Sequence, residues 1–209
     1  MPTILGANSD TGAYEISNSL VLYGGDSKLT QTPGSDGDRQ KWTWNGWVKR
    51  TGVEDDGMLF SVGTYTRIQF SSDTLYVQVS NNDSTAHAIQ TDRKFRDPAA
   101  WYMITVAVDT TQGTAANRCV IWVNGEQQSM SSNAGTPSGN ITAFQTSLSN
   151  SHFWGGIYGS ASGLDNAYLT QCVYCDGQAY SASNFGETDS RFGKTPPQRF
   201  CCAHWPWTT

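Results

Sequence analysis

The sequence is poor in positive charge. It holds 13 Lys and Arg against 18 Asp and Glu, which gives a net charge of −5 at pH 7. Its largest basic clusters are the dipeptides Lys49-Arg50 and Arg93-Lys94. Proteins that bind nucleic acid gather Lys and Arg on one surface to neutralise phosphates. We therefore expect no nucleic-acid partner.

Long apolar runs and targeting signals are also absent from the sequence. No run approaches the ~18 residues of a membrane-spanning helix, and the N-terminal stretch MPTILGANSD has neither a basic region nor an apolar region. We expect no membrane insertion and no signal peptide. The five cysteines are odd in number and irregularly placed, which is typical of a reduced cytoplasm; they are Cys119, Cys172, Cys175, Cys201 and Cys202.

Little in the sequence favours helices. The chain has 21 Gly and 7 Pro among 209 residues, and both residue types destabilise helix interiors. Its apolar segments are dominated by Val, Ile, Thr, Trp and Tyr, which favour strands. A chain of this size can bury roughly 70% of its unfolded surface. We expect one large all-β domain that does not need disulfides for stability.

The most sharply patterned stretch runs from residue 95 to residue 128. Residues 101–108 alternate with period two, which places Tyr102, Ile104, Val106 and Val108 on one apolar face of a strand. A polar loop follows, and then an apolar run over 119–123 ends at Asn124-Gly125. Asn-Gly between two such runs is a strong hairpin signal because both turn positions need positive φ.

Other segments predict further short strands separated by turn signals. The Trp-rich stretch 41–50 predicts a central strand with Trp42, Trp44, Gly46 and Val48 on one face and Trp47 on the other. Gly46 marks a bulge or a close backbone approach. The remaining expected strands are 19–23, 28–32, 58–62, 65–70, 74–79, 87–91, 141–144, 151–156 and 164–174, with a helical turn over 181–185 and a loop over 126–139. This pattern is typical of a sandwich or jelly roll.

The order of motifs resembles a known family. KWTWNGWVKR, FRDPAAWYMITVAVDTT, VIWVNGEQ and LDNAYLTQCVYCDGQAYSASNFGETD are similar to the laminin-G-like, concanavalin A-like domains of bacteriophage structural proteins, especially marine ones. The resemblance covers residues 15–190 and implies a two-sheet antiparallel jelly roll on a virion surface. Residues 1–14 would form an N-terminal arm. The tail 191–209 departs from the family pattern.

Enzymatic activity is not expected. Glycoside hydrolysis needs two carboxylates at a fixed separation, and the only Glu residues, at 15, 54, 126 and 187, lie in expected loops or termini. The GSASG stretch has Ala161 where a nucleophile elbow needs Ser. Neither a glucanase nor a serine hydrolase fits these residues.

Metal sites are weakly indicated. Calcium is the common cofactor of the implied fold, and its candidate ligands are better explained as turn-forming aspartates; they are Asp55, Asp56, Asp97, Asp109 and Asp165. A zinc site could draw on Cys172, Cys175, Cys201, Cys202 and His204. Residues three apart on a strand point to opposite faces, so Cys172 and Cys175 converge only if the strand ends at Tyr174. A disulfide and unlinked thiols are the alternatives.

The aromatic residues divide into expected core and expected contacts. We expect Trp44, Trp101, Trp122 and Trp154 in the core, since a strand Trp gains most when buried. The expected exposed glycan contacts are Tyr65, Asn81, Asn82, His152 and Tyr158, because sugar rings stack on aromatic faces and amides bond hydroxyls. Trp205 and Trp207 in the tail are the expected subunit contacts.

Two functions remain open from the sequence. The first is a non-enzymatic virion surface protein that is made in the host bacterial cytoplasm. It would be a decoration protein, capsid fibre or tail appendage that presents a lectin-like domain to host-surface glycans. The second is a structural module that binds only other virion proteins. Both imply other virion proteins as partners and a homo-oligomer.

Overall fold

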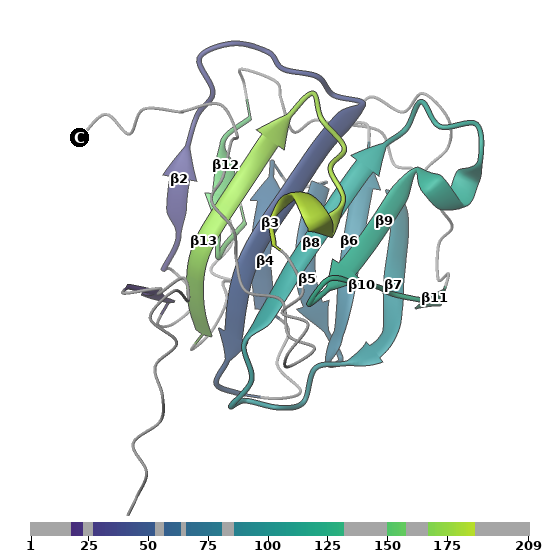
Figure 1. Ribbon diagram of the computed structural model, residues 1–209. Coiled ribbons are helices and arrows are strands. Elements are labelled where there is room, and N and C mark those ends of the chain that lie inside the picture. The colour runs from purple at the N-terminus through teal and green to yellow at the C-terminus, as the bar shows by residue number, and fades with distance from the viewer. Residues whose placement is uncertain are drawn as a thin grey trace, which may run out of the picture.

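The computed structural model describes residues 18–22, 27–52, 57–63, 66–80, 86–131, 150–157 and 167–186. They form two antiparallel sheets packed face to face, as Figure 1 shows. Sheet A has the order β1-β13-β3-β8-β9-β10 and sheet B the order β11-β7-β6-β5-β4-β12-β2. The expected all-β, two-sheet antiparallel jelly roll is confirmed.

The strand bounds follow the expected segments closely. Sheet A contains β1 (Leu20–Leu22), β3 (Lys41–Arg50), β8 (Tyr102–Asp109), β9 (Cys119–Val123), β10 (Glu126–Gln127) and β13 (Ala167–Asp176). Sheet B contains β2 (Leu29–Gln31), β4 (Gly57–Val62), β5 (Thr66–Ser71), β6 (Thr74–Ser80), β7 (Ala86–Lys94), β11 (Met130–Ser131) and β12 (His152–Trp154). The loop expected over 126–139 was partly wrong because β10 and β11 lie there, and the strand expected over 141–144 lies outside the described residues.

Strand β3 lies at the centre of sheet A between β13 and β8, as predicted. Trp42, Trp44 and Val48 are fully buried in the main core between the sheets. Trp47 points away from that core and packs against a second cluster on the outer face of sheet A. The period-two pattern therefore predicts the two faces of this strand correctly.

Two turns adopt the backbone geometry that their sequences predict. Asn124 and Gly125 have φ values of 52° and 85°, and they join β9 to β10 in a hairpin. Gly63 has a φ of 56° at the β4 end of the β4–β5 hairpin. Asn and Gly tolerate positive φ at low cost, so these turns set the register of their hairpins.

A bulge in β13 changes which of its side chains face the core. Thr170 pairs with Trp47 and Val173 pairs with Asn45, so β13 has one more residue than β3 across this interval. Gln171 occupies the bulge with a φ of 50°. Residues before it face inward at odd numbers and residues after it at even numbers, which brings Tyr174 to the core.

The outer face of sheet A carries a third layer. The 3-10 helix η3 (Ala182–Asn184) lies across this face in Figure 1. Ala182 and Phe185 pack with Met103 and Cys175 in the second cluster. Both faces of β8 are therefore buried, whereas its sequence pattern predicts only one apolar face. In the part of the chain that the structure describes, no helix is long and apolar enough to cross a membrane.

Candidate functional site

The structure tests one of the five predicted glycan contacts. His152 lies in β12, is only 5% exposed, and packs edge-on against Phe60 and Tyr174 with ring centroids 5.7 Å and 5.1 Å away. The expectation that it is an exposed contact was wrong, because the strand turns this side chain into the aromatic core. The other four lie outside the described residues, as do Trp205 and Trp207; the four are Tyr65, Asn81, Asn82 and Tyr158.

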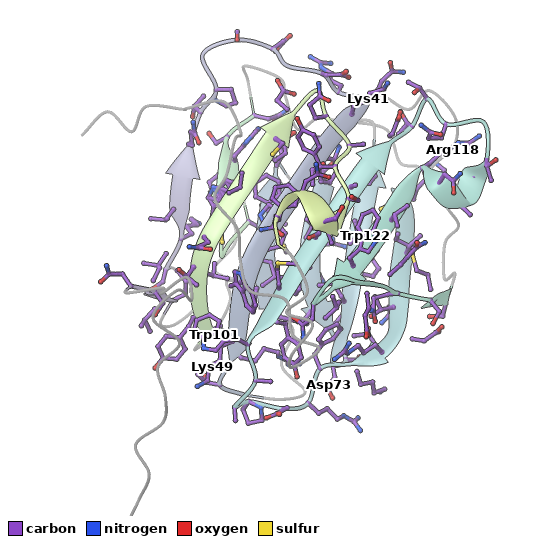
Figure 2. The ribbon with its side chains drawn as sticks, in the orientation of Figure 1. Lys41, Lys49, Asp73, Trp101, Arg118 and Trp122 are labelled. Carbon is purple, nitrogen blue, oxygen red and sulfur yellow. The ribbon has the colours of Figure 1, made fainter. Side chains whose placement is uncertain are left out.

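The predicted core tryptophans separate into two groups. Trp44 is fully buried and Trp154 is 9% exposed, and both belong to the main core as expected. Trp101 and Trp122 are only half-buried and lie on the outer face of sheet A, so their assignment to the main core was wrong. Trp101 packs against Tyr168 with ring centroids 6.3 Å apart. Figure 2 shows Trp101 near one end of this face and Trp122 farther along it.

Aspartates in the described residues hold turns together. Asp97 accepts a hydrogen bond from the Ala99 backbone at 2.8 Å, and Asp109 accepts one from the Thr111 backbone at 3.0 Å. Both are turn-forming, as predicted. Burial raises the pKa of Asp109, but hydrogen bonds from Thr111 and Gln112 outweigh this effect, so the pKa is lowered overall.

Asp38 and Asp176 lie close together at the end of β13. Asp176 Oδ1 accepts the Asp38 backbone N–H at 2.9 Å, while Asp38 Oδ1 accepts from the Gln40 backbone at 2.8 Å. Burial raises the pKa of Asp176, and the nearby charge of Asp38 adds to this rise. These contacts fix the loop before β3.

Glu126 lies in the exposed strand β10 and not in a loop, and it takes no part in the contact between Asp38 and Asp176.

The cysteines of β13 do not converge. The strand continues to Asp176, so the condition under which Cys172 and Cys175 could meet is not fulfilled. Cys172 packs against the main core and Cys175 belongs to the second cluster, on opposite faces of sheet A. Neither forms a disulfide within the described residues, and among these residues no three His, Cys, Asp or Glu side chains are placed to hold a metal.

The outer face of sheet B carries two cross-strand rows of side chains. The first row contains Thr30, Phe153, Ser61, Arg67, Gln78 and Ala88, each paired with the next. The second row contains Met58, Gln69, Tyr76, Gln90 and Ser131. Where the rows cross β5, β6 and β7 they bring together five polar side chains, here called the polar face: Arg67, Gln69, Tyr76, Gln78 and Gln90.

Hydrogen bonds fix the centre of the polar face. The Gln78 side-chain oxygen accepts from Arg67 Nε at 3.0 Å and from the Tyr76 hydroxyl at 3.1 Å. The Arg67 guanidinium also lies 5.6 Å from the centroid of the Tyr76 ring. Gln90 donates from its amide to the Thr74 hydroxyl. These contacts hold an aromatic ring, a guanidinium and two amides in one arrangement without a ligand.

Some donors on the polar face remain available. Within the described chain, the terminal nitrogens of Arg67 make no hydrogen bond, and neither does the Gln69 amide. Arg67, Gln69 and Tyr76 are all half-buried, so each presents part of its surface to solvent. Fixed donors beside an aromatic ring are what a sugar-binding surface requires, because hydroxyls take hydrogen bonds and ring carbons pack on aromatic faces.

The sequence contains a signal for part of this face. The alternation over 74–79 already predicts Tyr76 and Gln78 on the solvent side of a half-buried strand. Arg67 and Gln69 alternate in the same way on the preceding strand. Only the register between the strands shows that these pairs lie side by side, and that register comes from the structure.

Comparison with known proteins agrees with the architecture. Residues 23–162 match the family model described as the concanavalin A-like lectin/glucanases superfamily. A search of curated proteins finds no match.

Solved structures share the fold at low identity. Mouse laminin alpha1 chain domains LG4-5 align with a TM-score of 0.58 and 13% identity over 81% of this chain and 44% of that chain. A heptameric SAP-like pentraxin from Limulus polyphemus aligns with a TM-score of 0.50 and 17% identity over 80% of this chain and 74% of that chain. A structure of botulinum neurotoxin type C, whose cell entry depends on interaction with two ganglioside molecules, aligns with a TM-score of 0.53 and 10% identity over 78% of this chain and 40% of that chain.

The chain spans less than half of the laminin and neurotoxin chains that it matches. At these identities the likeness establishes the fold alone. The family match covers well over half of the sequence and agrees with the two-sheet topology. The chain therefore belongs to the concanavalin A-like lectin/glucanase superfamily, as a lectin-like, laminin-G-like domain.

Proposed function

We propose that this protein is a non-enzymatic glycan-binding module that uses the polar face of sheet B. The observation that carries the proposal is the fixed arrangement of Arg67, Tyr76 and Gln78, with the Arg67 terminal nitrogens and the Gln69 amide available beside them. Neighbouring strands lie about 4.8 Å apart, so three strands span about 10 Å. This length fits two linked sugar rings.

A binding role agrees better with the described carboxylates than hydrolysis does. Neither row on the outer face of sheet B contains Asp or Glu. The two approaching aspartates, Asp38 and Asp176, are engaged in holding a loop at the end of sheet A. A hydrolase of this fold would need two carboxylates facing a sugar-binding surface.

We further propose that the module acts on the surface of a bacteriophage virion. Support comes from the resemblance of the motifs over residues 15–190 to phage structural proteins. In this setting the partners are other virion proteins and host-surface glycans, and multiple copies would raise weak glycan affinity through avidity. Immunogold labelling of purified particles tests this location, and labelling confined to the host cytoplasm would contradict it.

A glycan array with the purified protein tests the binding function. We expect saturable binding that is lost in Tyr76→Ala. The matched control is Tyr168→Ala, which removes a half-buried tyrosine from the outer face of sheet A. If both variants bind as well as the unmodified protein, the polar face is not the binding site.

A purely structural assembly module is the second candidate. The observation that favours it is the group of half-buried aromatic residues on the outer face of sheet A: Trp47, Trp101, Trp122 and Tyr168. Aromatic side chains that remain partly exposed are common at protein interfaces. Loss of self-association or of particle incorporation in Trp122→Ser, with glycan binding unchanged, would assign assembly to this face.

A further inference from the structure

We propose that the polar face selects acidic glycans, that is, sugars that carry a carboxylate or a sulfate. This inference rests on the proposed glycan-binding function and names its ligand class. The ligand's acidic group would bind the Arg67 terminal nitrogens, and its ring would lie along Tyr76 and Gln69.

The charge on this face differs from that of the whole chain. The protein carries a net charge of −5, yet the two outer rows of sheet B contain one formally charged residue, Arg67, and no carboxylate. Asp92 on β7 is exposed, but it lies at the edge of the sheet, where its backbone N–H donates to the Ser129 carbonyl at 3.2 Å. Arg67 can therefore attract an anion to the polar face, and no described carboxylate in the same two rows repels it.

A second cation lies at the border of the first row. Lys28 Nζ is 5.7 Å from the centroid of the Phe153 ring and donates to the Ile157 carbonyl at 3.4 Å. Phe153 and Arg67 both pair with Ser61. Two strand spacings, about 10 Å, therefore separate the Arg67 and Phe153 positions. Ser61 and Phe153 lie between the two cations and are only 0% and 5% exposed, so Lys28 adds positive charge at the border of the face and is not a second exposed contact in the row.

The state of Arg67 favours an anion with two oxygens that can accept parallel hydrogen bonds. Its Nε is already bonded to Gln78 and its guanidinium lies near the Tyr76 ring, so the side chain loses little freedom when a ligand binds. Two terminal nitrogens on a fixed guanidinium can donate in parallel to the two oxygens of one carboxylate or sulfate. A neutral hydroxyl can take only one such bond and gains no charge assistance.

The test compares three polysaccharides of similar length by isothermal titration calorimetry with the full chain: polygalacturonate, dextran sulfate and neutral dextran. The variants are Arg67→Gln, which removes the charge, and Arg67→Lys, which keeps the charge but removes the two parallel N–H donors of the guanidinium. Arg118→Gln is the control, because Arg118 bonds backbone carbonyls in a loop beside β9, away from sheet B. Circular dichroism verifies that each variant is folded.

We expect binding to an acidic polymer but not to dextran, an affinity loss of at least about tenfold in Arg67→Gln, a smaller loss in Arg67→Lys, and no change in Arg118→Gln. Whether polygalacturonate or dextran sulfate binds more tightly identifies the acidic group. Equal binding of dextran and the acidic polymers, unaffected by Arg67→Gln but lost in Tyr76→Ala, would overturn acid selectivity and leave the glycan-binding function intact. Binding to no glycan in this assay or on the array would overturn both.

Discussion

Gly46 on β3 lies opposite the bulge in β13, and the Cys172 sulfur is 2.9 Å from the position that a Cβ on residue 46 would occupy. The Trp44 ring is 3.0 Å from the same position. The absence of a side chain at residue 46 therefore makes room for two core side chains at the point where β13 shifts its register. The sequence predicts a bulge or a close backbone approach at Gly46; the bulge lies in the partner strand β13, and the atoms closest to the position of a Cβ on residue 46 belong to side chains.

Gly46→Ala should destabilise the protein because the added methyl group has no room. Overpacking a well-filled core costs about 1–3 kcal/mol, and the expected loss in the free energy of unfolding lies in that range by urea denaturation. Gly113→Ala is the matched control, since nothing lies within 4 Å of the position of its Cβ. Equal stability of the two variants would contradict the close packing at Gly46.

Asp73→Asn should cost more than any surface substitution at the same end of the sandwich. Asp73 is 1% exposed, and it accepts hydrogen bonds from Arg50 at 3.2 Å and from Arg96 at 2.7 Å. Loss of the carboxylate leaves the buried Arg50 without its anion, which typically costs about 3–5 kcal/mol. Asn tolerates the positive φ of 67° at this turn. A loss of stability would therefore come from the removed negative charge and not from backbone strain.

The control for this ion pair is Arg96→Gln. The Arg96 side chain is 58% exposed, so we expect a change of less than about 1 kcal/mol. Thermal and urea denaturation of both variants measure the difference. A larger loss in Arg96→Gln than in Asp73→Asn would show that the exposed arginine, and not the buried pair, stabilises this end.

Trp44→Ala and Trp101→Ala should differ strongly in stability. Trp44 is fully buried, and truncating such a residue costs about 3–5 kcal/mol. Trp101 is half-buried on the outer face of sheet A, so its truncation should cost clearly less. Denaturation midpoints of the two variants provide the comparison. Equal losses of stability would contradict the placement of Trp101 on the outer face of sheet A.

Cys119 and Cys172 should resist alkylation in the folded protein. Burial raises the pKa of both thiols to about 12 from an ordinary value of 9.0, so the reactive thiolate is scarce at pH 8. Mass spectrometry after iodoacetamide treatment should find both unmodified until denaturant is added. Rapid modification of either thiol in the folded state would contradict this placement.

The same pKa shifts predict how stability changes with pH. Above pH 9 the two thiols ionise in the unfolded chain but remain protonated in the folded chain up to about pH 12. The unfolded state then binds fewer protons, so the free energy of unfolding falls as the pH rises through this window. In Cys119→Ala this alkaline loss should be smaller, as measured by urea denaturation at pH 8 and pH 10.

Local pattern predicts much of this fold. Period-two alternation identifies the inward face of β3 and β8, and Asn124-Gly125 identifies the hairpin after β9. The bulge at Gln171 has no comparable local signal, because Gln is not a residue that favours positive φ. It lies opposite Gly46, so its position depends on how β13 pairs with β3, which the local sequence of β13 does not show.

The misplaced tryptophans have a physical reason. Alternation tells which residues share a face, but not which segment later covers the opposite face. Trp122 pairs with Thr105 on the outer face of sheet A, and the segment around Phe185 packs there from a distant part of the sequence. His152 was misjudged for the related reason that its short strand is inserted between β4 and β2.

The polar-face site is tested most directly by an amide NMR titration of the isotopically labelled chain with short oligosaccharides of whichever acidic polymer binds more tightly. A site on the polar face predicts that chemical shift changes concentrate at Arg67, Gln69, Tyr76, Gln78 and Gln90 and saturate with one affinity. Changes confined to other parts of the chain, such as Asn81 and Asn82 or the outer face of sheet A, would contradict it.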